Sequence, residues 1–282
     1  MSAKRFLPLA LRYALLTAVA LLILYPLYII VVNSLLPSAR LAQVPPRFFP
    51  QPAFQPGSWE WQTYGNAWSR GNLANAAWVS IVVAFLVVIG QVITAILAGY
   101  AFAFLEFPLK KVIFVVFLAT LMIPIEVTFL ENLSVITDLG LYNTYAGLAL
   151  PFMATGLGAF LLRQAFLTVP KDLQDAARLD GFGHLRFMFR VAVPLVRPTV
   201  AALTVFAFLG AWSQYLWPLV ASSSKGDRWT IQIALRNLLR TNLANINVTF
   251  AGIVIALIPT LILLLFFQKQ LVRGLTAGAV KG

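Results

Sequence analysis

The sequence predicts an all-α integral membrane protein with six transmembrane helices. Hydrophobic residues make up 60% and charged residues 11% of the 282 residues, whereas charged residues form about a quarter of a soluble globular domain. Several long stretches carry few or no charges, and about 20 apolar residues in a helix cross a hydrocarbon core. We expect residues 1–282 to form a single transmembrane domain.

Each span is placed where charged side chains are rare, because Asp, Lys or Arg at a helix centre costs about 2.5 to 3.5 kcal/mol. The first apolar run follows a basic N-terminus and is too long for the core of a signal peptide. The expected spans are Tyr13–Leu36, a helix within Gly71–Leu105, a helix from Lys111 past Glu126, Leu139–Leu162, and helices within Val191–Ser222 and Thr241–Gln268.

The distribution of Lys and Arg predicts the orientation of the chain. Six spans place both termini on one side, and 14 of the 21 basic residues then fall on that side and seven on the other. Because Lys and Arg accumulate in cytoplasmic loops, we expect both termini to be cytoplasmic. The net charge of +12 therefore follows mostly from topology. Nucleic acid is not an expected partner, because binding it needs basic residues interleaved with aromatics on a soluble face.

Two other features lie around the second span. The preceding loop, Pro37–Arg70, holds six of the sixteen prolines and three of the seven tryptophans. Proline at that density excludes regular helix from "PPRFFPQPAFQPGSWEWQTY", and the aromatics suit either a docking surface or an ordinary membrane-interface loop. On the span itself, Gly90, Thr94 and Ala98 recur every four residues, which predicts close approach of another helix.

The most polar segment lies between the fourth and fifth spans, at about residues 169–190. Pro170 suits a helix start, and Asp172 lies in the first turn, where the helix dipole favours an anion. Asp180 and Gly181 end the helix, because glycine adopts a positive φ readily. The narrow apolar face of this predicted helix consists of Leu173, Ala176 and Ala177.

Two interpretations of this helix are open. A helix resting on anionic lipid would use the basic and aromatic residues that follow it, Arg186, Phe187, Phe189 and Arg190. Three of the nine acidic residues lie within Asp172–Asp180, however, and an anionic leaflet repels them. The pattern therefore favours a helix that docks on a protein.

The same segment resembles the EAA motif of permeases from binding-protein-dependent ABC importers. That motif reads E-A-A-x-x-x-G, nine residues, then I-x-L-P. Here Asp175, Ala176 and Ala177 precede Gly181 by the same spacing, and Val191–Pro194 follow after nine residues. Asp replaces Glu at the first position, and Val replaces Ile and Leu in the hydrophobic pair.

Other stretches extend the resemblance over nearly the whole chain. "PPRFFP", "FLLRQAF", "GAWSQYLWPLV" and the terminal "GLTAGAVKG" look like the second permease subunit of the maltose-type, carbohydrate-uptake branch. "TLMIPIEV", "YAGLALPFMA" and "SQYLWPL" also look similar to glycerol-3-phosphate permeases of that branch. The implied location is the plasma (inner) membrane of a bacterium or archaeon.

The resemblance implies a transport subunit rather than an enzyme. The chain has no G-x-x-x-x-G-K-[ST] sequence for phosphate binding, so no cofactor is expected here, and ATP and Mg would be bound by partner ATPase subunits. The implied partners are a companion permease, two cytosolic ATPase subunits, an extracytoplasmic solute-binding protein, membrane lipid and a small sugar-like solute. Glycerol phosphate and oligosaccharides fall within that solute class.

Specific residues inherit roles from the resemblance. The ATPase-coupling element would be formed by Asp175, Ala176, Ala177, Asp180 and Gly181. In the cytoplasmic C-terminal tail, 269–282, the resemblance implies ATPase contact by Gly274, Gly278 and Lys281. A frayed terminus is the alternative for that tail.

Candidates for the solute pathway are fewer. Glu126 follows Lys111 by fifteen residues, about 22 Å along a helix, and an intramembrane carboxylate commonly faces a cavity or a partner. A position at the outer interface is the alternative. On the fifth span, stacking faces and polar groups suited to a polyhydroxylated solute come from Trp212, Gln214, Tyr215 and Trp217. An aromatic belt at the membrane interface explains two of these equally well.

Two other function classes compete with the importer. An ion-coupled secondary transporter or channel subunit would need several ionisable groups in its spans, and only Glu126 is available. An intramembrane enzyme would need a nucleophile with a base, or metal ligands. The chain has no cysteine and one histidine, so no metal site is expected.

Overall fold

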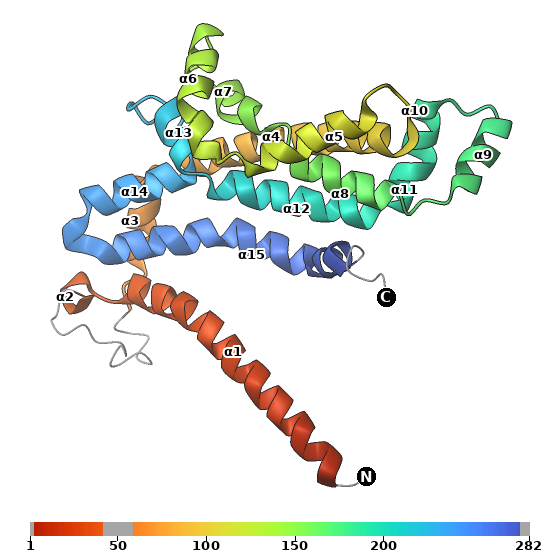
Figure 1. The fold of residues 1–282 in the computed structure, drawn as a ribbon. Coiled ribbons are helices and arrows are strands. Elements are labelled where there is room, and N and C mark those ends of the chain that lie inside the picture. The colour runs from red at the N-terminus through yellow and green to blue at the C-terminus, as the bar shows by residue number, and fades with distance from the viewer. Residues whose placement is uncertain (1–2, 42–58, 277–282) are drawn as a thin grey trace. The chain divides into compact units, whose positions relative to one another are not determined.

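The computed structural model describes residues 3–41 and 59–276, and all regular secondary structure within them is helical (Figure 1). This confirms the all-α prediction. The chain divides into two compact units, one of residues 1–74 and 234–258 and the other of residues 75–233 and 259–282. The expectation of one domain over residues 1–282 stays a prediction.

Within the described residues, three helices are long and apolar enough to cross a membrane by themselves. They are α1 (Ala3–Leu35), α4 (Leu73–Phe104) and α15 (Ile246–Thr276), with candidate spans at Leu9–Leu35, Leu73–Phe104 and Leu243–Lys269. These three correspond to the expected first, second and sixth spans.

The other expected spans are bent pairs of helices, so the structure contains six spans if each pair crosses the membrane once. The pairs are Lys110–Met122 with Ile125–Asp138, bent by 93°; Tyr145–Phe152 with Gly156–Phe166, bent by 52°; and His184–Leu195 with Arg197–Ser213, bent by 82°. Prolines account for two of the bends. Ile123 is extended before Pro124, as a residue before proline prefers, and Pro198 sits in the first turn of its helix, where its missing N–H is tolerated.

The remaining elements are shorter than these three helices. In the first unit they are α2 (Ser38–Leu41), α3 (Gln62–Arg70), η6 (Leu243–Asn245) and most of α14 (Ile231–Thr241). The second unit contains α5 (Lys110–Ala119), η2 (Thr120–Met122), η3 (Ile125–Thr128), α6 (Phe129–Asp138), α7 (Tyr145–Ala149), η4 (Leu150–Phe152), α8 (Gly156–Phe166), α9 (Lys171–Leu179), α10 (His184–Phe187), η5 (Met188–Ala192), α11 (Val193–Leu195), α12 (Arg197–Ser213) and α13 (Leu216–Ala221).

Small residues on α4 allow close packing inside the second unit, as the sequence predicts. A Cβ added at Gly90 would collide with Met153, and the Thr94 hydroxyl donates to the Met153 carbonyl oxygen at 3.0 Å. Nine residues after Gly90 on the same helix, a Cβ at Gly99 would lie 2.7 Å from Cβ of Leu162 on α8. These contacts hold α8 and the bend before it directly against α4.

The two ends of the second unit are formed by different sets of short helices (Figure 1). Helices α4, α8 and α12 run side by side, with α9 and α10 at one end and α6, α7 and α13 at the other. At the α13 end, Trp217 is fully buried and donates its indole N–H to the Gly147 carbonyl oxygen at 3.3 Å.

In the first unit, Asn247 joins α15 to the segments around α3. Its Nδ2 donates to the Leu36 carbonyl oxygen at 3.0 Å and to Glu60 Oε2 at 3.1 Å. The sequence "PPRFFPQPAFQPGSWEWQTY" falls largely outside the described residues, but its last three residues form the start of α3. The expectation of no helix there is wrong at this end, because the last proline of the stretch is Pro56 and the helix begins six residues later, at Gln62.

Candidate functional site

Helix α9 forms where the polar segment predicts a short helix. Pro170 caps its start, Asp172 lies in its first turn, and Arg178 lies in its last turn. The two charges match the helix dipole, which favours an acid near the N-terminus and a base near the C-terminus. The helix has a strongly polar and a weakly apolar side, but its nine residues are too few to be stable alone in water.

Glycine ends α9 in the conformation that the sequence predicts. Gly181 has φ +74°, and its N–H donates to the Arg178 carbonyl oxygen at 3.0 Å. The N–H of Phe182 donates to the Ala177 carbonyl oxygen at 2.8 Å. This pair of bonds is the Schellman motif, which satisfies the last carbonyl groups of a helix.

Most of the predicted apolar face of α9 is exposed. Only Ala177 is buried, at 7% exposure, whereas Leu173 and Ala176 are exposed. Leu179 is 90% exposed. The side of α9 that faces away from its own unit therefore offers small and apolar side chains beside the exposed carboxylate of Asp175.

The charges on that exposed face are nearly free to bind elsewhere. Asp175 Oδ1 lies 3.7 Å from an Arg178 nitrogen, and both side chains are more than half exposed. A pair with this exposure contributes about 1 kcal/mol or less. Asp175 can therefore exchange this partner for a basic residue of another protein at little cost.

The inner side of this segment packs on the helical bundle. Ala177 and Phe182 contact a cluster that includes Phe166 of α8 and Phe187 of α10. The Arg186 guanidinium lies 4.2 Å from the ring centre of Phe182. Because Phe187 is 2% exposed, it packs in the protein core, and a lipid-resting surface would include only Phe189 of the two phenylalanines.

Two residues near α9 were missed by sequence reasoning. Tyr100 of α4 is 4% exposed, and its Oη lies 3.1 Å from Nδ1 of His184, the first residue of α10. Gln174 of α9 buries an Nε2 atom that has no hydrogen-bond partner among the described residues. The two members of the Tyr100–His184 pair are 84 residues apart, so no local pattern in the sequence signals their contact.

The candidate solute-pathway residues fall into two places. Trp212, Gln214 and Tyr215 lie together at the interruption between α12 and α13, and Gln214 Oε1 is buried with no hydrogen-bond partner among the described residues. Gln232 donates to the Trp212 carbonyl oxygen at 3.3 Å. Interrupted helices at membrane depth occur where they line a cavity or are buried in protein.

Glu126 lies apart from that interruption, on η3, directly after the 93° bend. Its side chain is exposed. Because the chain breaks at Pro124, Lys111 and Glu126 do not lie on one straight helix, and their separation in sequence does not give the depth of Glu126. Among the described residues, no group of three or more His, Cys, Asp or Glu could hold a metal ion.

The C-terminal tail is described only in part. Gly274 falls within α15, which continues to Thr276. Gly278 and Lys281 lie outside the described residues. The predicted contact of this tail with an ATPase stays a prediction.

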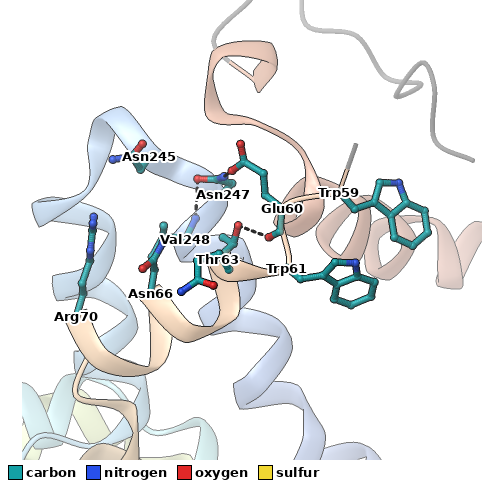
Figure 2. Close-up of a pocket in the computed structure, with 10 residues that line it drawn as sticks. Trp59, Glu60, Trp61, Thr63, Asn66, Arg70, Asn245, Asn247 and Val248 are labelled. Atoms are coloured by element: carbon teal, nitrogen blue, oxygen red, sulfur yellow. Dashed lines mark hydrogen bonds between the residues drawn. The ribbon is translucent and has the colours of Figure 1, made fainter. Parts of the chain in front are cut away.

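A cavity of about 390 Å³ opens in the first unit (Figure 2). Trp59 and Trp61 lie on one side of it, and Arg70 and Asn245 lie on the other. One carboxylate, that of Glu60, and one guanidinium line it together with several side-chain amides. The described lining carries no formal net charge, so the cavity suits a neutral polar group better than an anion.

Comparison with known families decides what kind of protein presents this site. Residues 91–277 match the family described as "Binding-protein-dependent transport system inner membrane component". The chain belongs to this family. The matched range contains α9, its glycine turn and the interruption between α12 and α13, so every described candidate site except the cavity lies inside the shared part of the permease.

Curated relatives extend the match over almost the whole permease. It is 35% identical over 263 residues to the sn-glycerol-3-phosphate transport system permease protein UgpE of Yersinia pestis bv. Antiqua (strain Antiqua). It is 34% identical over 264 residues to the proteins of the same name in Rhizobium meliloti (strain 1021) and Brucella abortus (strain 2308). Each match covers 90% of this chain and 91% of the relative.

A solved structure shares the fold. The permease superposes with a TM-score of 0.79 on a chain in the crystal structure of a bacterial ABC transporter involved in the import of the acidic polysaccharide alginate. The match covers 95% of this chain and 98% of that one, at 22% sequence identity. The fold of an ABC importer permease is therefore confirmed.

Family membership settles the class of function. The chain is a membrane subunit of a binding-protein-dependent transport system, which confirms the resemblance seen in the EAA-like segment. Its relatives are named as transport permease proteins, as expected for a non-enzymatic subunit. The importer interpretation is thereby favoured over the secondary transporter and the intramembrane enzyme.

Proposed function

We propose that this permease is the membrane subunit of an ATP-driven importer and that α9 docks on a cytosolic ATPase subunit. One observation carries the proposal: α9 is anchored on one side and free on the other. Ala177 is buried against the bundle, while Asp175, Ala176 and Leu179 are exposed. A helix held in this way moves as a rigid body and passes a displacement to the elements beneath it.

The coupling residues would then have separate tasks. The carboxylate of Asp175 accepts charge-assisted hydrogen bonds from a basic residue of the ATPase. Ala176 lets the ATPase surface approach the α9 backbone closely. Asp180 and Gly181 form the turn that directs the chain from α9 towards α10 and the fifth span.

The proposed assembly contains a companion permease, two cytosolic ATPase subunits and an extracytoplasmic solute-binding protein, surrounded by membrane lipid. The ATPase subunits bind ATP and Mg, and this chain binds no cofactor. Both termini lie in the cytoplasm of a bacterium or archaeon, so the tail with Gly274, Gly278 and Lys281 reaches the ATPase side. The excess of basic residues on the side of the termini supports this orientation.

We propose that the solute is a small sugar-like molecule of the glycerol-3-phosphate class. The support is the identity of 34% to 35% with glycerol-3-phosphate permeases over 90% of the chain. The interruption between α12 and α13 supplies suitable groups. Gln214 has a buried carbonyl oxygen free to accept from a solute hydroxyl, and Trp212 and Tyr215 lie beside it.

The cavity around Glu60 would lie on the extracytoplasmic side, because α3 comes between α1 and α4 in the sequence and the far ends of these two helices carry the cytoplasmic charges. We place the docking of the solute-binding protein there. A neutral, amide-rich cavity with the exposed indole of Trp61 at one side offers both hydrogen bonds and apolar contact to a protein loop.

The test is purification of the complex from its native membrane through a tag on this chain, followed by reconstitution in vesicles. We expect ATPase subunits and a second permease to co-purify, and we expect ATP-dependent uptake of labelled sn-glycerol-3-phosphate with maltose as the comparison solute. A purified complex without an ATP-hydrolysing subunit would contradict the importer assignment. Uptake of maltose but not glycerol-3-phosphate would contradict the solute assignment alone.

A further inference from the structure

We propose that Tyr100 is a positioning residue that links the coupling element to the second span, through its hydrogen bond with His184. This inference rests on the proposed function, because it assumes that an ATPase displaces α9. It adds a route for that displacement into α4, beside the covalent route from α9 into the fifth span.

Few contacts join α9 to the rest of its unit. Ala177 is the only buried residue of the helix. Beyond the glycine turn, Phe182 packs on the same cluster and Arg186 stacks on Phe182. A displacement of α9 therefore reaches the bundle through a small number of side chains at the turn between α9 and α10.

His184 is the point where this turn meets α4. It begins α10, and its Nδ1 shares a hydrogen bond of 3.1 Å with Tyr100 Oη. The two rings also meet edge to face, with centroids 6.2 Å apart. The bond joins side chains of two separate helices, so it constrains the orientation of α10 relative to α4.

Tyr100 is held rigidly enough to transmit that direction. Its ring is 4% exposed and contacts Phe104 of its own helix, Phe166 of α8 and Phe187 of α10, with centroid distances of 4.9 to 6.4 Å. Aromatic contacts of this kind favour particular orientations as well as burial. The phenol ring thus lies between three helices, and its hydroxyl is the polar contact to the coupling segment.

Conservative variants separate the hydroxyl from the ring. Tyr100→Phe keeps the packing and removes the hydrogen bond. His184→Leu removes the partner, whereas His184→Asn keeps a polar atom attached to Cγ, as Nδ1 is. Tyr142→Phe is the matched control, because Tyr142 donates to the Ser222 carbonyl oxygen at 3.2 Å at the α13 end of the unit.

The measurement is the number of solute molecules imported per ATP hydrolysed by the reconstituted complex, with thermal stability recorded for each variant. We expect Tyr100→Phe and His184→Leu each to lower this ratio about five-fold, the effect of losing one hydrogen bond. The double variant should lower it no further, His184→Asn should largely restore it, and Tyr142→Phe should leave it unchanged.

The outcomes distinguish the two proposals. If the wild-type complex hydrolyses ATP and imports solute but Tyr100→Phe keeps the wild-type ratio, the link through Tyr100 is overturned and the importer assignment stands. Multiplicative effects in the double variant would also overturn it, because the two residues would then act separately. If the wild-type complex shows no ATP-driven import, the proposed function itself fails.

Discussion

The backbone N–H of Phe182 donates to the carbonyl oxygen of Ala177 at 2.8 Å, so the one buried residue of α9 and the first residue after its glycine turn are bonded directly. Both side chains pack on the same hydrophobic cluster. The turn is therefore part of the folded core at its inner side, although Gly181 itself is exposed.

Replacement of Gly181 by Val should uncouple ATP hydrolysis from import. No atom would meet the new Cβ within 4 Å, so the cost is conformational rather than steric: φ is +74°, and a left-handed conformation costs a residue with a Cβ about 1 to 2 kcal/mol. Gly181→Asn is the control, because Asn tolerates this region. Equal solute-per-ATP ratios for wild type and Gly181→Val would contradict the prediction.

Replacement of Asp175 by Asn should weaken ATPase binding without affecting the fold. Its ion pair with Arg178 is exposed and long, at 3.7 Å, so thermal stability should change by about 1 kcal/mol or less. Co-purification of the ATPase subunit should fall several-fold, since a charge-assisted bond is lost. Asp175→Glu, which keeps the carboxylate, should retain binding. Equal ATPase recovery from Asp175→Asn would exclude a role for this charge.

Replacement of Gly90 by Ala should destabilise the permease. The added Cβ would collide with Met153, and overpacking of this kind costs about 1 to 3 kcal/mol. Gly210→Ala on α12 is the matched control, because its Cβ would meet nothing within 4 Å, and it should stabilise by about 0.4 to 1 kcal/mol. Thermal unfolding in detergent measures both, and a Gly90→Ala variant as stable as Gly210→Ala would refute the packing argument.

Replacement of Gln214 by Leu should impair import and leave stability intact. The Gln214 Oε1 atom is buried without a partner among the described residues, so a nonpolar side chain of similar size removes an unmet acceptor. We expect the KM for solute to rise about ten-fold, which corresponds to a loss of about 1.4 kcal/mol. Wild-type KM in a normally folded Gln214→Leu variant would remove this residue from the proposed pathway.

Replacement of Asn247 by Leu should destabilise the first unit by about 1 to 3 kcal/mol, the cost of leaving buried polar groups unpaired. Asn247 is 3% exposed and donates to both the Leu36 carbonyl oxygen and Glu60. Asn245→Leu is the comparison, because Asn245 is exposed and accepts a bond of 3.3 Å from Ser38. Similar melting temperatures for the two variants would show that the Asn247 bonds contribute little.

Local chemistry explains what could be predicted for the coupling segment. Pro170, Asp172 and Gly181 predict the limits of α9 because each acts through its own backbone or the helix dipole, and the structure places the helix between them. The apolar face was predicted less well. Spacing alone puts Leu173 and Ala176 beside Ala177, but burial depends on which neighbours lie beneath the helix.

The sequence also locates the membrane spans but does not give the angles at which they bend. Hydrophobic stretches locate membrane segments, since apolar length alone decides whether a segment can cross a bilayer. Glu126 follows the 93° bend at Pro124, so it does not lie on the axis of the helix that begins at Lys110. Proline marks such a site in the sequence, yet the angle depends on packing against other helices.

The sequence by itself determined the helical membrane class, the limits of the coupling helix and the EAA-like spacing that indicates the permease family, because these depend on residues close together in the chain. The tertiary structure alone decided that Tyr100 meets His184 across 84 positions and that only Ala177 anchors α9 by burial. Contacts between distant segments arise from the way the helices pack, and no short stretch of sequence contains that information.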